Sequence, residues 1–155
     1  MKKMLLLFLL LTTGIFAQWE TIKIKDEFGD ETGQFQMFCF SNIEKSTILI
    51  SPPLKNLPSG ILIITNYYFG SESKNINFKL KNENNELLET KGSTYKNNVI
   101  VLKSVLPKEF NETINFFEKS KNIRIAIPTE EGKNILIEVD SSNFNEIFSL
   151  IKDKI

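Results

Sequence analysis

Short stretches in which apolar and polar residues alternate recur along most of this chain. In N-I-R-I-A-I-P at 122–128 the isoleucines take every second position, and N-I-L-I-E-V-D at 134–140 repeats the pattern. Because side chains of a β-strand point to opposite faces in turn, a period of two predicts strands with one buried face. Gly132 lies between the two stretches, so they are expected to form a hairpin.

Other stretches have the composition or spacing of strands and are bounded by proline, glycine or asparagine. They lie at 19–25, 34–41, 47–50, 61–69, 75–81, a segment returning through Leu87 and Leu88, and 99–102. The stretch at 34–41 has apolar side chains on both faces, which is typical of a strand covered from two sides. We therefore expect it to be a central strand.

Two segments instead have the period of an amphipathic helix. After Pro107, the apolar residues of F-N-E-T-I-N-F-F at 110–117 recur at spacings of four and three. The segment 144–151 has a similar apolar face, and Ser142 or Asn143 could cap its start.

Eight or nine short strands against two short helices predict a mainly β fold. The expected architecture is an antiparallel β-sandwich or barrel, with the helices over one opening and the second helix at the C-terminus. The segment 18–155 has the size of one ordinary domain and shows no linker. Residues 18–155 are therefore expected to form a single β-rich domain.

Residues 1–17 have the pattern of a secretory signal peptide. Lys2 and Lys3 precede an apolar run from Met4 to Leu11, and the small residue Ala17 stands before polar sequence. The run is far shorter than the roughly 20 residues that cross a bilayer. We expect export to the periplasm or the extracellular space, with no membrane span in the mature chain.

The balance of charge disfavours a polyanionic partner. Without Lys2 and Lys3, the 19 basic residues become 17 against 19 acidic ones, a net charge of −2. Nucleic-acid binding needs a basic patch or stripe. No nucleic-acid partner is expected.

The chain has no histidine and a single cysteine, Cys39. A Ser-His-Asp triad, a Cys-His dyad and a histidine-ligated metal are therefore excluded, as is an internal disulfide. Cys39 lies in apolar sequence and is expected to be a buried structural residue. No cofactor is predicted, and the chemistry left is carboxylate acid–base work, an oxygen-ligated cation, or a lysine or tyrosine nucleophile.

The stretch D-E-F-G-D-E-T-G at 26–33 concentrates carboxylates and glycines. Closely spaced carboxylates can hold calcium, but the EF-hand register puts Phe28 and Glu31 where an oxygen ligand and a glycine are needed. A looser cation site with Asp26 and Asp30 is one alternative. An acid–base pair is another, although nothing here indicates the raised pKa of a general acid.

We favour a third interpretation, in which this stretch is the turn between two strands. Gly29 and Gly33 would supply positive φ angles, and an aspartate side chain would bond its own backbone. Phe28 would then fold back onto the core as the anchor of the turn.

The chain resembles a family of small exported bacterial proteins of unknown function that open with tryptophan and then D-E-F-G-D-x-T. The matching pieces are Trp19, 26–30 with Thr32, Phe40 to Asn42, the strands 123–127 and 135–140, and the helix at Phe144. It is also similar to periplasmic proteins of the invasion-associated type and to a type VI secretion accessory protein. These resemblances imply a β-sandwich and a non-catalytic role, with Trp19 as a structural residue.

The favoured function is therefore an exported, non-enzymatic binding or accessory protein, whose partner is another envelope or secreted protein. A loop end or an exposed strand edge would form its binding surface. No catalytic residue is assigned.

Two alternatives stay open. A secreted hydrolase working through two carboxylates would use Glu27, Asp30 or Asp140. An envelope structural subunit would use the aromatic run at 67–69 as a contact patch, since adjacent aromatics of a strand point to opposite faces and at least one should be exposed.

Overall fold

The computed structural model describes residues 18–25, 28–41, 45–52, 59–95, 97–103 and 107–155. The predicted signal peptide at 1–17 lies outside these ranges and stays a prediction. Asp26 and Glu27 also lie outside them.

The described residues form nine strands and two short α-helices, followed by a 3₁₀ turn. The strands are β1 (Trp19–Lys25), β2 (Glu31–Ser41), β3 (Ser46–Ser51), β4 (Gly60–Ile64), β5 (Asn75–Asn82), β6 (Leu87–Tyr95), β7 (Val99–Lys103), β8 (Asn122–Pro128) and β9 (Asn134–Asp140). The helices are α2 (Pro107–Lys119) and α3 (Phe144–Phe148), and η1 spans Lys152–Lys154. The predicted mainly β fold, with a last helix near the C-terminus, is confirmed.

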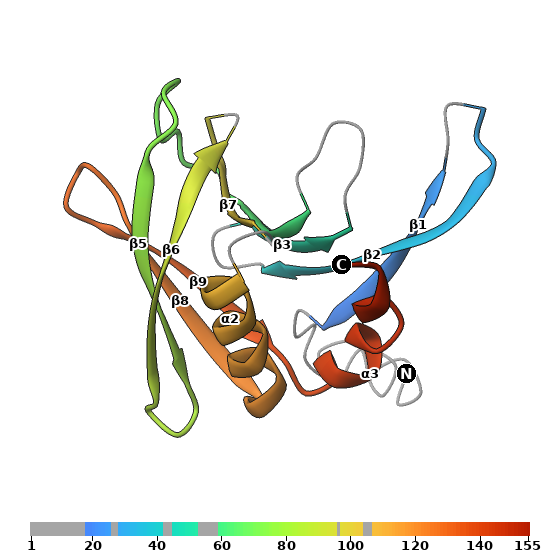
Figure 1. Ribbon diagram of the computed structural model, residues 1–155. Coiled ribbons are helices and arrows are strands. Elements are labelled where there is room, and N and C mark those ends of the chain that lie inside the picture. The colour runs from blue at the N-terminus through green and yellow to red at the C-terminus, as the bar shows by residue number, and fades with distance from the viewer. Residues whose placement is uncertain (1–17, 26–27, 42–44, 53–58, 96, 104–106) are drawn as a thin grey trace, which may run out of the picture.

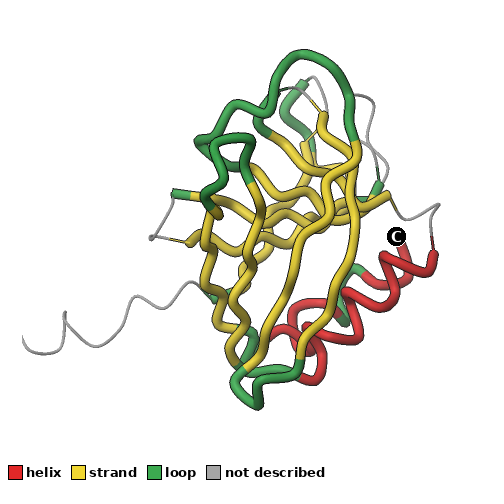
Figure 2. Tube along the Cα trace, turned by 90° about the vertical axis from the view of Figure 1, so that its left-hand side faces the viewer, coloured by secondary structure: helices red, strands yellow, loops and turns green. Residues whose placement is uncertain are grey.

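All nine strands belong to one antiparallel sheet in the order β1-β2-β3-β4-β7-β6-β5-β8-β9. The sheet is strongly curled, with the β1–β2 hairpin at one side and β5, β6, β8 and β9 at the other (Figure 1). It is not closed into a barrel, although the backbone N–H of Glu138 on β9 donates to Ser41 Oγ on β2 at 3.3 Å. Both helices lie on one side of the sheet (Figure 2).

Two strand predictions need correction. β2 is not central but second from the sheet edge; Met37 and Cys39 are buried on its inner face, whereas Phe40 on the other face is 43% exposed. The strand expected over 61–69 ends at Ile64, because the Thr65 hydroxyl accepts the backbone N–H of Tyr67 and the chain turns there.

A cluster of aromatic rings joins the start of the sheet to both helices. The ring of Trp19 on β1 meets Phe117 of α2 edge-on at 5.4 Å and Phe144 of α3 at 5.1 Å, and the two phenylalanines stack at 5.2 Å. All three side chains are at most 1% exposed. Such pairs stabilise beyond the area they bury, and Trp19 lies in the buried core.

Asn143 strengthens this junction, in a way the sequence did not predict. It makes no side-chain cap to α3. Its Oδ1 instead accepts the backbone N–H of Trp19 at 3.1 Å, and its Nδ2 donates to the Trp19 carbonyl at 2.8 Å. The side-chain amide therefore pairs with the first residue of edge strand β1 as a neighbouring strand would.

The turn between β1 and β2 has the predicted glycines but not the predicted anchor. Gly29 and Gly33 have positive φ angles of 89° and 72°, and the Thr32 hydroxyl donates to the Ile24 carbonyl at 2.9 Å. Phe28 is 83% exposed, so the expectation that it packs on the core is wrong. The reason is geometric: the ends of β1 and β2 next to this turn project beyond the body of the sheet (Figure 1).

The two phenylalanines make a matched test of this core. We expect Phe117→Ala to lower the free energy of unfolding by about 3–5 kcal/mol, because it empties space among buried rings. Phe28→Ala should change it by less than about 0.5 kcal/mol, as at other exposed sites. Urea unfolding of both variants measures this, and similar losses for the two would contradict the placement of Phe28.

Candidate functional site

The ladder between β6 and β7 is short. It pairs Ser93–Tyr95 with Val99–Val101, while β7 stays paired with β4 as far as Lys103. The remainder of β6, residues 87–92, has no ladder partner on this side within the described residues, although β7 passes close to Gly92. The two strands therefore diverge and leave an open strand edge inside the sheet.

Gly92 lies at the point of divergence. A Cβ atom there would come within 2.6 Å of Ile100 Cγ2 and 3.0 Å of the Val101 carbonyl oxygen. Only a residue without a side chain lets β7 cross this closely over β6. A side chain at position 92 would therefore push against β7 where the two strands part.

Helix α2 lies beside the open edge and is fastened to the β5–β6 turn at its far end. The carboxylate of Glu83 accepts the backbone N–H groups of Lys121 and Asn122, each at 3.1 Å. These hydrogen bonds, that of Asn122 first, lower the pKa of Glu83. Ser120 Oγ lies 3.4 Å from Asn82 Nδ2, so the end of α2 and the turn are held together.

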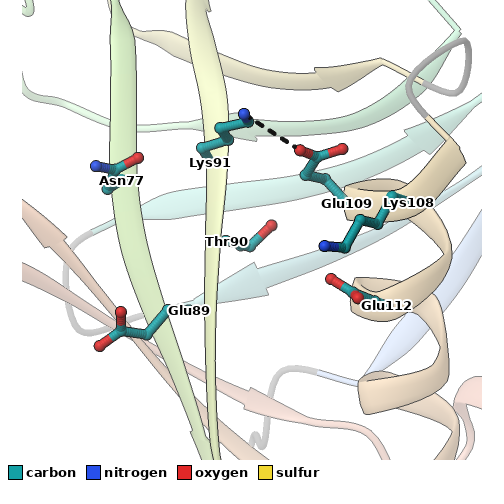
Figure 3. Close-up of a pocket in the computed structure, with 7 residues that line it drawn as sticks. All are labelled: Asn77, Glu89, Thr90, Lys91, Lys108, Glu109 and Glu112. Atoms are coloured by element: carbon teal, nitrogen blue, oxygen red, sulfur yellow. Dashed lines mark ion pairs between the residues drawn. The ribbon is translucent and has the colours of Figure 1, made fainter.

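Between β6 and the first turns of α2 lies a cleft of about 300 Å³ (Figure 3). It is lined by Asn77 of β5, by Glu89, Thr90 and Lys91 of β6, and by Lys108, Glu109 and Glu112 of α2. Its volume is near the lower limit of ligand pockets, and its walls are polar and charged.

Some of the charged side chains that line the cleft form ion pairs. Lys91 Nζ spans the cleft to Glu109 at 3.4 Å (Figure 3), and Glu89 pairs with Lys79 at 2.7 Å. Glu109 is partly buried, whereas the other three side chains are exposed, and exposed pairs contribute little to stability. Lys108 and Glu112 form no ion pair within the described residues.

Thr90 is the one cleft residue whose hydroxyl is both buried and unsatisfied. The residue is 7% exposed, its side chain points from β6 toward α2 (Figure 3), and Oγ1 has no hydrogen-bond partner in the described structure. A buried polar atom left unpaired costs about 1–3 kcal/mol. A polar group placed in the cleft could recover part of that loss.

Glu109 is better suited to binding than to acid catalysis. The pKa of Glu109 is lowered, first by a hydrogen bond from its own backbone N–H and then by Lys91. A general acid needs a raised pKa. The cleft can therefore offer fixed positive and negative charges to a ligand.

The carboxylates suspected from the sequence lie elsewhere. Asp30 is exposed in the β1–β2 turn, and Asp140 ends β9, where its Oδ1 accepts the Ser142 N–H at 2.8 Å. Within the described residues, no cluster of three or more Asp, Glu or Cys side chains could hold a metal ion. A cation site with Asp26 and Asp30 stays a prediction, because Asp26 is outside the described ranges.

The aromatic run at 67–69 follows β4 in a loop. Tyr68 is 61% exposed, which confirms that at least one of these rings reaches solvent. Tyr67 instead packs edge-on against buried Phe69 at 5.0 Å. One exposed ring is a small surface on which to build a subunit contact.

The cleft was not predicted from the sequence. One signal for it was present, since an isolated glycine within a strand marks a bulge or a close backbone approach, and Gly92 interrupts L-L-E-T-K-G-S-T-Y. No pattern in the sequence places Lys108 and Glu112 opposite β6.

Comparisons with family models, curated proteins and solved structures find no match for this chain. The resemblance drawn from its sequence motifs therefore stays a prediction. Among the described residues, the structure has no helix of the length and apolarity that a membrane crossing requires.

Cys39, expected to be structural, is 1% exposed. Burial raises the pKa of its thiol to about 12, and the nearby carboxylates of Asp140 and Glu20 also contribute to the rise. Because the thiolate is the reactive form, we expect very slow labelling by thiol reagents in the folded protein at mildly alkaline pH, and fast labelling in denaturant. Fast native labelling, with the fold intact by circular dichroism, would contradict this burial.

Proposed function

We propose that this protein is an exported, non-enzymatic binding or accessory module that holds its partner in the cleft between β6 and α2. The observation that carries the proposal is the open edge of β6, which lines a cleft together with unpaired polar groups. Strand edges are common places for a partner to add. Export is supported by the lysine pair, apolar run and Ala17 of the segment 1–17.

The charges of the cleft favour binding over hydrolysis. Glu109, a partly buried carboxylate of the cleft, is held as an anion by its own N–H and by Lys91. The lining is polar and charged, unlike the apolar surroundings that raise the pKa of a carboxyl group. Glu109 therefore acts as a fixed anion that can bind a ligand, and not as a general acid.

In-cell photo-cross-linking tests this function. A photoreactive amino acid replaces Glu112, in the cleft, or Glu131, which is exposed in the turn between β8 and β9. We expect partner adducts only from position 112, in the exported fraction, on a chain that begins at Gln18. When Lys108→Glu is combined with the photoreactive residue at position 112, the adducts should decrease while the amount of the exported protein stays the same.

Equal adducts from both positions would show that the cleft is not the binding site. A chain that stays in the cytoplasm with the segment 1–17 still attached would contradict export.

A further inference from the structure

The backbone of β6 has hydrogen-bonding groups on the side away from β5. The Thr94 N–H donates to the Lys74 carbonyl at 2.8 Å on the β5 side, and the β5–β6 register is unbroken from Ser93 to Leu87. Because backbone groups of successive strand residues point to alternate sides, those of Glu89 and Lys91 point away from β5. They point to the side on which β7 leaves β6, where the described residues supply no ladder partner for them.

The side chains opposite this edge have the spacing of an extended peptide. Lys108 and Glu112 are four residues apart on α2, which is about 6 Å along a helix. Two residues of a β-strand advance about 6.6–6.8 Å and point to the same face. A strand in the cleft could therefore place an acidic side chain on Lys108 and a basic one on Glu112.

The direction of such a strand follows from the arrangement of β6 and α2. Lys91 lies level with the first turn of α2, and Glu89 lies level with Glu112 (Figure 3). The helix therefore runs opposite to β6. A strand antiparallel to β6 would run in the direction of the helix and present its acidic residue before its basic one.

Resting on the proposed function, we propose that the ligand is an extended segment of a partner polypeptide that adds to β6 as an antiparallel strand. The backbone of this segment forms hydrogen bonds with the backbone groups of Glu89 and Lys91. An acidic side chain of the segment pairs with Lys108, and a basic side chain two positions later pairs with Glu112. The hydroxyl of Thr90 gains a polar partner in the complex. The cleft volume of about 300 Å³ limits the tightly held part to a short segment.

Capped synthetic heptapeptides test the proposal by titration calorimetry against the chain lacking residues 1–17. The parent peptide alternates valine with polar residues and carries glutamate and lysine two positions apart, in that order. Two further peptides bear N-methyl groups on alternate backbone nitrogens. One is methylated at the odd-numbered residues and the other at the even-numbered residues. A free glutamyl-lysine dipeptide supplies the same charges without a strand.

We expect the parent peptide to bind. The peptide whose N-methyl groups face β6 should bind at least about tenfold more weakly, because the methyl groups remove strand hydrogen bonds and add bulk at the edge. The peptide whose N-methyl groups face solvent should bind as well as the parent. Equal binding by the two methylated peptides, or binding of the dipeptide as strong as that of the parent peptide, would overturn strand addition.

Variants of the protein test the side-chain contacts. Thr90→Val, of similar shape, should weaken binding about 3- to 10-fold without lowering the melting temperature of the free protein, since the hydroxyl has no partner there. The double change Lys108→Glu with Glu112→Lys should reverse the preference, so that the peptide with lysine before glutamate binds better. An unchanged preference would overturn the charge pairing.

The outcomes separate this inference from the function on which it rests. If no peptide binds while cross-links from position 112 persist in the cell, strand addition is wrong and the binding function stands. If the cross-links are also absent, both fall.

Discussion

The packing of Trp19 between Phe117 and Phe144 is the interaction on which the rest of the structure depends. It brings together β1, α2 and α3, which are separated along the chain by strands of the sheet. Asn143 adds two hydrogen bonds to the Trp19 backbone. The curled sheet is thereby held around its helices although its edge strands do not close into a barrel.

The same cluster determines where a cleft can form. Phe117 and the hydrogen bonds of Glu83 fix the last turns of α2 against the sheet. Its first turns are joined to β6 by the ion pair of Lys91 and Glu109. Gly92 lets β7 cross over β6 and leave it. A firmly held helix and a diverging strand together leave the edge of β6 open.

Local sequence patterns predicted most of the strands and helices. The alternating isoleucines of β8 and β9 and the apolar face of α2 were predictable because burial alone determines them. The positions of Phe28 and Asn143 were not predictable, because they depend on tertiary geometry. Phe28 is exposed near the β1–β2 turn, and Asn143 pairs with Trp19, 124 residues away in the sequence. The cleft was hidden for the same reason: Lys108 and Glu112 have the pattern of ordinary solvated helix residues until the helix is placed beside β6.

The central claim is that the edge of β6 is open toward the cleft, and amide hydrogen exchange followed by NMR tests it most directly. The account predicts that the amides of Glu89 and Lys91 exchange orders of magnitude faster than those of Thr90 and Gly92, which bond to β5. Equal protection of all four amides would contradict it, because the edge would then already be paired.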